Sequence, residues 1–197
     1  MRKASTFEFR RRPSCHSSLF SSTTSSMSRI DEQYTKSYTL QGEGAGTKVS
    51  ITTDTGHSLS TDIPLKMGGK DSAPQPVETL LAAWMGCTQA TALFVGRQLP
   101  KRLAIERISF ENIRAVRDER GALELPIDTT PSVPSRIQTV TGTIRVYARK
   151  GQRIEPDQLK LLEEQTELRC PVANMMIASG CEMNVMWMDG LDDDTTN

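Results

Sequence analysis

The chain has 197 residues, and its 24 lysines and arginines balance its 24 aspartates and glutamates. This balance leaves no excess charge that would attract nucleic acid or an anionic membrane surface. The longest apolar run surrounds Trp84 and is interrupted by Thr79, Thr88 and Gln89, so we expect no membrane contact and no membrane-spanning helix. About 160 residues lie between the two biased ends, enough for one domain with its own core.

The two ends of the chain differ in composition from its middle. Residues 1–30 hold six arginines or lysines, one acidic residue and many serines and threonines, a composition typical of a transit peptide to the mitochondrion or another organelle. The alternatives are a disordered extension or a start at Met27, either of which favours a cytoplasmic protein. We expect the folded domain at residues 31–190, followed by an acidic tail at 191–197.

Short strands are expected first in the domain. The segments YTKSYTL, TKVSITT and HSLSTDI alternate between apolar and polar residues and are separated by glycines, a pattern that predicts a small antiparallel meander. A connection rich in glycine and proline then leads to a helix at residues 76–98, with Pro76 at its start and Pro100 beyond its end. This helix is apolar on nearly every side, so we expect it to be buried in the fold or in a dimer.

The second half of the domain is predicted to hold strands in AIERISFENIRAVRD, ALELPI and IQTVTGTIRVYAR. A second helix is expected to begin near Pro156, to break at Cys170 and to restart at Pro171, because proline cannot continue a helix. A last strand is predicted in CEMNVMWM. The grouping of strands favours an α+β fold over a doubly wound sheet.

Four cysteines, at positions 15, 87, 170 and 181, lack the close pairing of zinc ligands, so we expect neither a metal nor another cofactor. Cys87 lies in the apolar helix, where most cysteines are small core residues. Cys170 precedes a helix restart, where unpaired backbone N–H groups and the helix dipole are expected to lower the thiol pKa. For Cys15, in the leader, and Cys181, near the last strand, we expect no chemical role.

Two segments carry a resemblance to a known family. GGKDSAPQPVETLLAAWMGCTQAT and, some eighty residues later, CPVANMM resemble the two cysteine motifs of the OsmC-like family, which includes the organic hydroperoxide resistance proteins. The order of predicted elements over residues 34–189 is similar as well. The resemblance implies an OsmC-like fold, with an N-terminal meander, a long central helix, mixed strands and a second, cysteine-bearing helix, assembled as an intertwined homodimer with its sites at the subunit interface.

The resemblance also implies a thiol-dependent peroxidase that reduces organic hydroperoxides. Cys87 would attack the hydroperoxide and become a sulfenic acid, Cys170 would condense with it to form a disulfide, and a dithiol reductant would restore the pair. The apolar side chains of Leu81, Trp84 and Phe94 would suit a greasy substrate, and we expect them to line its pocket.

Two features depart from the family pattern. The peroxidases place a glutamate after the proline that precedes the central helix, where this chain has Val77, and Glu78 lies about 100° further around the helix. Their activating arginine is absent too, because no arginine lies between positions 29 and 97. Lys70 is the candidate substitute cation, although it is also explained as an ordinary solvated loop lysine. Glu78 is the candidate carboxylate, although it is also explained as an exposed carboxylate in the first turn of the helix.

Two other functions therefore remain open. The same disulfide could serve a redox sensor that does not turn over. Alternatively, the protein could bind an apolar ligand, with both cysteines as core residues.

Overall fold

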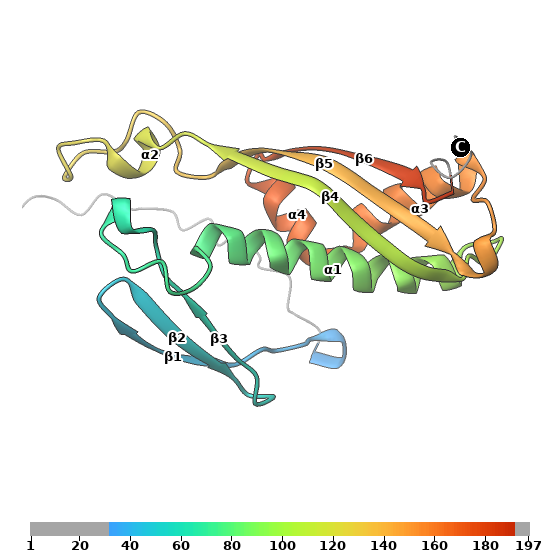
Figure 1. Ribbon diagram of the computed structural model, residues 1–197, viewed down its shortest axis with the longest axis horizontal. Helices are drawn as coiled ribbons and strands as arrows, with labels where there is room; N and C mark the ends of the chain where they lie inside the picture. Colours follow the sequence, from blue (N-terminus) through green and yellow to red (C-terminus); the bar gives the residue numbers. More distant parts are fainter. Residues whose placement is uncertain (1–31, 192–197) are drawn as a thin grey trace, which may run out of the picture. The chain divides into compact units, whose positions relative to one another are not determined.

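A computed structural model describes residues 32–191 of the chain, which divides into two compact units, Met1–Thr39 and Leu40–Asn197 (Figure 1). The described part of the first unit contains the short 3-10 helix η1 (Glu32–Tyr34). All other described elements belong to the second unit. The expected leader at residues 1–30 and the acidic tail beyond residue 191 lie outside the described residues.

The first sheet of the second unit is the expected antiparallel meander. It consists of β1 (Leu40–Ala45), β2 (Lys48–Thr53) and β3 (Ser58–Thr61), in that order. The first strand was predicted in YTKSYTL but begins at Leu40, the last residue of that segment, and runs through Gly42 and Gly44. Both glycines pair with β2, so their role is within the strand, while Gly46, with φ of 63°, makes the tight turn between β1 and β2.

The connection after β3 contains the 3-10 helix η2 (Leu65–Met67) and ends at helix α1 (Pro76–Gln98), whose bounds match the prediction. Gln75 caps α1, and Pro76 occupies its first turn, where a missing N–H costs nothing. Only one side of α1 is buried within the chain, at Trp84, Thr88, Ala92, Val95 and Gly96. The expected burial on all sides is therefore not reached in a single chain.

The second sheet has the order β4–β5–β6. The long strands β4 (Ile105–Arg117) and β5 (Ile137–Ala148) pair antiparallel, and β6 (Glu182–Asp189) pairs parallel to β5. The connection from β5 to β6 contains the 3-10 helix η3 (Arg149–Gly151), α3 (Pro156–Arg169) and α4 (Pro171–Ala178), with the predicted break at Cys170. Figure 1 shows α1, α3 and α4 on one face of this sheet.

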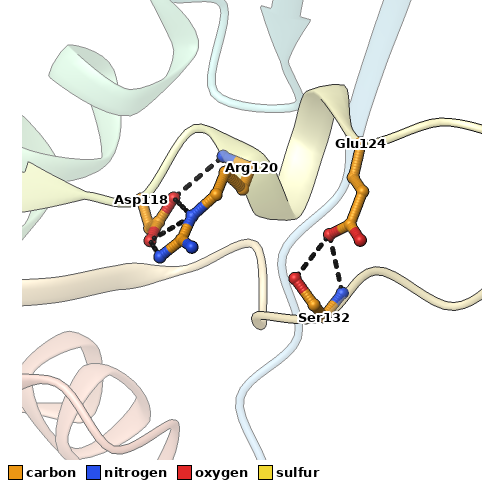
Figure 2. A network of polar contacts seen from close by, with 4 residues as sticks. All are labelled: Asp118, Arg120, Glu124 and Ser132. Carbon is orange, nitrogen blue, oxygen red and sulfur yellow. Dashed lines mark hydrogen bonds and ion pairs between the residues drawn. The ribbon is translucent and has the colours of Figure 1, made fainter.

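The predicted strand in ALELPI was wrong. This segment belongs to the link between β4 and β5, where residues 120–123 form the short helix α2 (Arg120–Leu123) and the rest forms a loop. Figure 2 shows how the link is held: the Arg120 guanidinium pairs with Asp118, and the Glu124 carboxylate accepts hydrogen bonds from the N–H and hydroxyl of Ser132. The alternating apolar residues Leu123, Leu125 and Ile127 are exposed and pair with no strand.

The core lies between the β4–β5–β6 sheet and the three helices on its face. Its largest fully buried apolar side chains are Val140, Ile144 and Val146 of β5 and Leu162 of α3. β5 contributes most of them because it is the middle strand and is covered by the helices. The α+β fold expected from the sequence is confirmed, and the core places α1 directly against α3 and α4.

Among residues 32–191, α1 is the one helix long and apolar enough to cross a membrane, with an 18-residue window of mean hydropathy 1.3. The expectation that no apolar stretch reaches this length was therefore wrong for α1. Core helices of soluble proteins meet the same criterion, and α1 packs against α3, α4 and β4. The length and composition of α1 therefore do not distinguish a membrane-spanning helix from a core helix.

Candidate functional site

The cysteine of the first motif, Cys87, lies near the middle of α1 and is half-buried, packed against the core. The buried side chains of Trp84 and Thr88 flank it on the same helix. Trp84 is fixed by an edge-to-face contact with Phe110 of β4, with ring centroids 6.2 Å apart. Cys87 follows Trp84 by three residues on α1, so the two side chains lie on the same face of this helix.

The cysteine of the second motif, Cys170, is fully buried at the break between α3 and α4. It ends α3 by donating its N–H to the Thr166 carbonyl at 2.9 Å, and it caps α4 because its sulfur accepts the Ala173 N–H at 3.4 Å. The Asn174 side chain donates to the carbonyls of Glu167 and Cys170 at 2.8 and 2.9 Å, which satisfies the open end of α3. Backbone and cap together leave the Cys170 thiol little freedom.

The structure brings these two thiols together. Both are free, and the Cys87 side chain lies close enough to the Cys170 thiol to influence its pKa. Burial raises the pKa of Cys170, and the nearby Cys87 thiol raises it further, whereas the Ala173 N–H and the nearby Thr88 hydroxyl act in the opposite direction. The expectation that a helix start lowers this pKa was wrong, because desolvation of the thiolate outweighs the donated N–H. The Cys170 thiol is therefore neutral at physiological pH.

A small cavity of about 10 Å³ lies near the two cysteines, although neither of them lines it: its walls include Thr88, the neighbour of Cys87 in sequence, and Ala173, which donates its N–H to the Cys170 sulfur. Its walls are mostly apolar and include both tryptophans of the chain, Trp84 and Trp187. Three polar residues line it as well, Thr88 of α1 and Thr166 and Glu167 of α3. The Thr166 hydroxyl is buried without a hydrogen-bond partner among the described residues, and burial raises the pKa of the Glu167 carboxyl.

Sequence reasoning missed Thr166 and Glu167. Their signal is their spacing, because they precede Cys170 by four and three residues and α3 continues up to that position. Residues three and four apart share one face of a helix, so both were bound to lie on the Cys170 side of α3. The polar residue on α1 follows the same logic, since Thr88 is the neighbour of Cys87 in sequence.

The two candidates for activating the thiolate lie elsewhere in the chain. The Glu78 carboxylate accepts the Gln75 N–H at 2.8 Å and forms a capping box at the start of α1. The Lys70 side chain is exposed and lines a separate cavity with Asp62 and Glu43. Within one chain, neither residue lines the cavity beside the two cysteines.

Asp62, which the sequence did not single out, organises the connection that carries Lys70. Its buried carboxylate accepts hydrogen bonds from two hydroxyls, that of Thr47 at 2.7 Å and that of Ser72 at 2.9 Å. It also accepts hydrogen bonds from three backbone N–H groups, those of Ile63 at 2.9 Å, Ser72 at 3.1 Å and Lys70 at 3.3 Å. The Thr47 hydroxyl is the main reason that the Asp62 pKa lies far below its usual value, and the Ser72 N–H comes next. This carboxylate ties the β1–β2 turn to the connection before α1.

The three residues expected to line a substrate pocket do not share one within the chain. Trp84 lines the cavity beside the cysteines, whereas Leu81 lines a larger hollow bordered by β4 and α2. Phe94 is 51% exposed and lines a groove with Leu161 and Arg169. Among residues 32–191, no group of three or more His, Cys, Asp and Glu side chains is arranged to hold a metal ion.

Comparison with known proteins assigns the family. The family model described as OsmC-like protein matches residues 69–186, more than half of the chain and both cysteine motifs. The chain belongs to the OsmC-like family. No curated protein sequence matches it.

Solved structures share the fold at low sequence identity. An OsmC-like protein from Mycoplasma pneumoniae is 17% identical, with a TM-score of 0.58, and the match covers 78% of this chain and 97% of that one. A protein from Psychrobacter arcticus described as a putative osmotic stress induced and detoxification response protein is 19% identical, with a TM-score of 0.57 and coverage of 78% and 98%. The organic hydroperoxide resistance protein OsmC of Legionella pneumophila is 14% identical, with a TM-score of 0.53 and coverage of 78% and 97%.

Proposed function

We propose that this protein is a thiol-dependent peroxidase that reduces organic hydroperoxides with Cys87 and Cys170. The observation that carries the proposal is the close approach of two free thiols, Cys87 of α1 and Cys170 between α3 and α4, near a cavity with mostly apolar walls. Membership of the OsmC-like family and the fold shared with an organic hydroperoxide resistance protein support a role in peroxide stress.

The reaction divides between the two thiols according to their burial. Cys87 is the more accessible sulfur, and its thiolate attacks the terminal oxygen of the hydroperoxide. The O–O bond breaks, the alcohol leaves after taking up a proton, and Cys87 becomes a sulfenic acid. The Cys170 sulfur then displaces hydroxide from Cys87, so that a disulfide and water form. A dithiol reductant returns two electrons by thiol–disulfide exchange.

A homodimer is part of this proposal. Leu80, Ala83, Gly86, Ala90 and Phe94 recur at helical spacing on α1, and all five are exposed in the single chain. A continuous apolar helix face of this kind marks an interaction surface. Covering this face with a second α1 would bury the helix on its remaining side and would close the approach to Cys87, which lies beside Gly86.

The dimer is tested with Gly86→Arg. A Cβ at Gly86 would meet no atom of another element within 4 Å, so we expect a monomer to accommodate the change and a dimer across this face to be disrupted by it. We expect light scattering to give a dimer for the wild type and a monomer for Gly86→Arg, with Glu164→Arg on α3 as the exposed control. A monomeric wild type would remove the shared-interface site from the proposal.

The peroxidase is tested by treating the reduced full-length protein with one equivalent of cumene hydroperoxide and mapping its cysteines by non-reducing peptide mass spectrometry. We expect a rapid link between Cys87 and Cys170 that is absent from Cys87→Ser and Cys170→Ser. Sustained turnover with a dithiol reductant should follow. Thiols that stay reduced, or that oxidise no faster than free cysteine, would contradict the proposal.

A redox sensor is the second candidate. It is favoured by the position of Lys70 in a separate cavity and by Val77, which stands where the family's peroxidases place a glutamate. A sensor would form the same disulfide slowly and would not turn over with a dithiol reductant. The turnover assay therefore separates the two functions.

The cellular setting is also part of the proposal. The basic, serine-rich leader favours import into the mitochondrion or another organelle, and a start at Met27 favours the cytoplasm. In either compartment we propose a hydroperoxide and a dithiol reductant as partners, with no nucleic acid and no membrane. Imaging a fluorescent fusion of the full chain beside one started at Met27 tests the leader.

A further inference from the structure

The break between α3 and α4 leaves backbone carbonyls open at the position of Cys170. Because α3 ends at Arg169, its last carbonyls have no N–H four residues further along the same helix. Pro171 stands where a continuous helix would donate an N–H to the Glu167 carbonyl, and proline has no N–H to donate. The break therefore needs a hydrogen-bond donor from another group.

The side chain of Asn174, in α4, is this donor. Its amide nitrogen Nδ2 donates to the carbonyls of Glu167 at 2.8 Å, Cys170 at 2.9 Å and Leu168 at 3.2 Å. All three partners only accept hydrogen bonds, so the NH₂ group of the amide has to face them. A single side chain thus connects the end of α3, the break and α4.

The polar groups of Cys170 are all held at this break. Its N–H donates to the Thr166 carbonyl at 2.9 Å, and its sulfur accepts the Ala173 N–H at 3.4 Å. Its carbonyl accepts the backbone N–H of Asn174 at 3.0 Å and the side-chain amide of the same residue at 2.9 Å. Among these contacts only the amide of Asn174 comes from a side chain, so a substitution can remove it and leave the others in place.

The position of the Cys170 sulfur depends on how α3 and α4 meet. Both helices pack against α1, which carries Cys87. Each is anchored by buried side chains, Leu162 and Thr166 of α3 and Ala173 and Met176 of α4. Cys170 lies between the two anchored segments with an extended backbone, φ of −78° and ψ of 109°. The Asn174 amide bridges these segments and so restricts the angle between them.

We infer that Asn174 is a positioning residue for the Cys170 thiol: its amide ties α3 to α4 and so holds this sulfur in place for disulfide formation with Cys87. The inference rests on the proposed function, because it requires that disulfide. A thiol held in place has a higher effective concentration at its partner, which favours both the rate and the equilibrium of disulfide formation. The attack on the hydroperoxide does not involve Asn174, because it takes place at Cys87 on α1.

Two substitutions remove the donor without creating a cavity, because Asn174 is exposed. Asn174→Ala removes the whole amide, and Asn174→Leu keeps a branched side chain that has no N–H. Alanine and leucine are good helix formers, so we expect α4 to persist in both variants. Asn184→Ala is the matched control, since Asn184 is also an exposed asparagine but lies on β6, outside the break.

The first experiment measures the equilibrium and needs no hydroperoxide. Full-length protein is equilibrated with mixtures of reduced and oxidised glutathione, and non-reducing peptide maps give the fraction with Cys87 linked to Cys170. Oxidised glutathione takes two electrons and two protons from the thiol pair, so one protein disulfide and two reduced glutathione molecules form. We expect Asn174→Ala and Asn174→Leu to lower the equilibrium constant about tenfold, which raises the reduction potential of the pair by about 30 mV. Asn184→Ala should match the wild type.

The second experiment separates the two steps after one equivalent of cumene hydroperoxide. Dimedone trapping and mass spectrometry give the rate of sulfenic acid formation on Cys87, and peptide maps give its conversion to the disulfide. We expect Asn174→Ala to form the sulfenic acid at the wild-type rate and to convert it about tenfold more slowly. A residue that only stabilises the fold would lower the urea midpoint and leave the equilibrium constant and the conversion rate unchanged.

The outcomes separate this inference from the proposed function. An equilibrium constant that is unchanged in Asn174→Ala, or lowered equally in Asn184→Ala, overturns the role of Asn174 while the peroxidase stands. Loss of sulfenic acid formation in Asn174→Ala also overturns it, because the role is confined to Cys170. A wild type that forms the link with glutathione but no sulfenic acid with the hydroperoxide overturns the peroxidase alone. A wild type that forms no link in either experiment overturns both.

Discussion

The hydroxyl of Thr166 is buried without a partner among the described residues, and Thr166 lines the cavity of about 10 Å³. This volume is close to the smallest that holds a water, so a stability measurement can show whether the hydroxyl binds one there. Thr166→Val replaces the hydroxyl by a methyl group of similar size, and valine and threonine have similar helix propensities. If the hydroxyl binds a water, the substitution removes a hydrogen bond with a net worth of about 1 kcal/mol. We therefore expect the free energy of unfolding to fall by about 1 kcal/mol.

The measurement is urea-induced unfolding followed by tryptophan fluorescence at a fixed protein concentration, since a dimer makes stability depend on concentration. Both tryptophans line the cavity, so the signal reports on the region that is changed. An unpaired buried hydroxyl destabilises a fold by about 1–3 kcal/mol, and its removal would raise the free energy of unfolding by that amount. A stabilised Thr166→Val would therefore refute the water site.

Three further predictions concern the rest of the fold. The Asp62 pKa is lowered in the folded state, so the stability that this carboxylate contributes is complete above its unfolded pKa of about 3.9 and is lost as pH falls below that value. The urea midpoint should therefore drop more steeply between pH 5 and 3 in the wild type than in Asp62→Asn. Equal slopes in the two proteins would contradict the prediction. Gly69→Ala should destabilise the fold by about 3 kcal/mol, because the new Cβ would lie 1.8 Å from the Ile63 carbonyl oxygen. The control Gly44→Ala, whose new Cβ has its nearest atom at 3.7 Å, should change the stability little in the same urea assay. Leu162→Ala, at a side chain with 0% exposure, should cost about 3 kcal/mol on thermal or urea unfolding, and a cost below about 1 kcal/mol would place Leu162 outside the packed core.

The elements predicted correctly from the sequence are those whose boundaries are set locally. Pro76 and Pro100 bracket α1, and Pro171 enforces the break between α3 and α4. ALELPI failed because its alternation is that of a strand, whereas residues 120–123 close into α2 and Pro126 offers no N–H to a strand partner. Packing requires a glycine at position 121, because a Cβ there would lie 2.7 Å from the Ser135 nitrogen. No local sequence pattern reveals this contact, since the two residues are distant in sequence.

The candidate site was predictable in its residues and not in its electrostatics. The two motifs identify Cys87 and Cys170, but their contact depends on how α3 and α4 cross between the parallel strands β5 and β6. The sign of the Cys170 pKa shift depends on burial, which is a property of the packed helices. A local argument from the helix start finds only the smaller, opposing contribution of the Ala173 N–H.

The position of the cysteines along the chain has a consequence for biosynthesis. Positions 87 and 170 are 83 residues apart, whereas Cys181 follows Cys170 by only 11 residues. In an unfolded chain, loop closure would bring Cys170 to Cys181 about 20 times more often than to Cys87. In the folded protein Cys181 is buried and its sulfur contacts that of Met183 at 3.8 Å, while Cys170 faces Cys87. A nascent chain thus has to stay reduced until β6 has paired with β5, because earlier oxidation would favour the wrong crosslink.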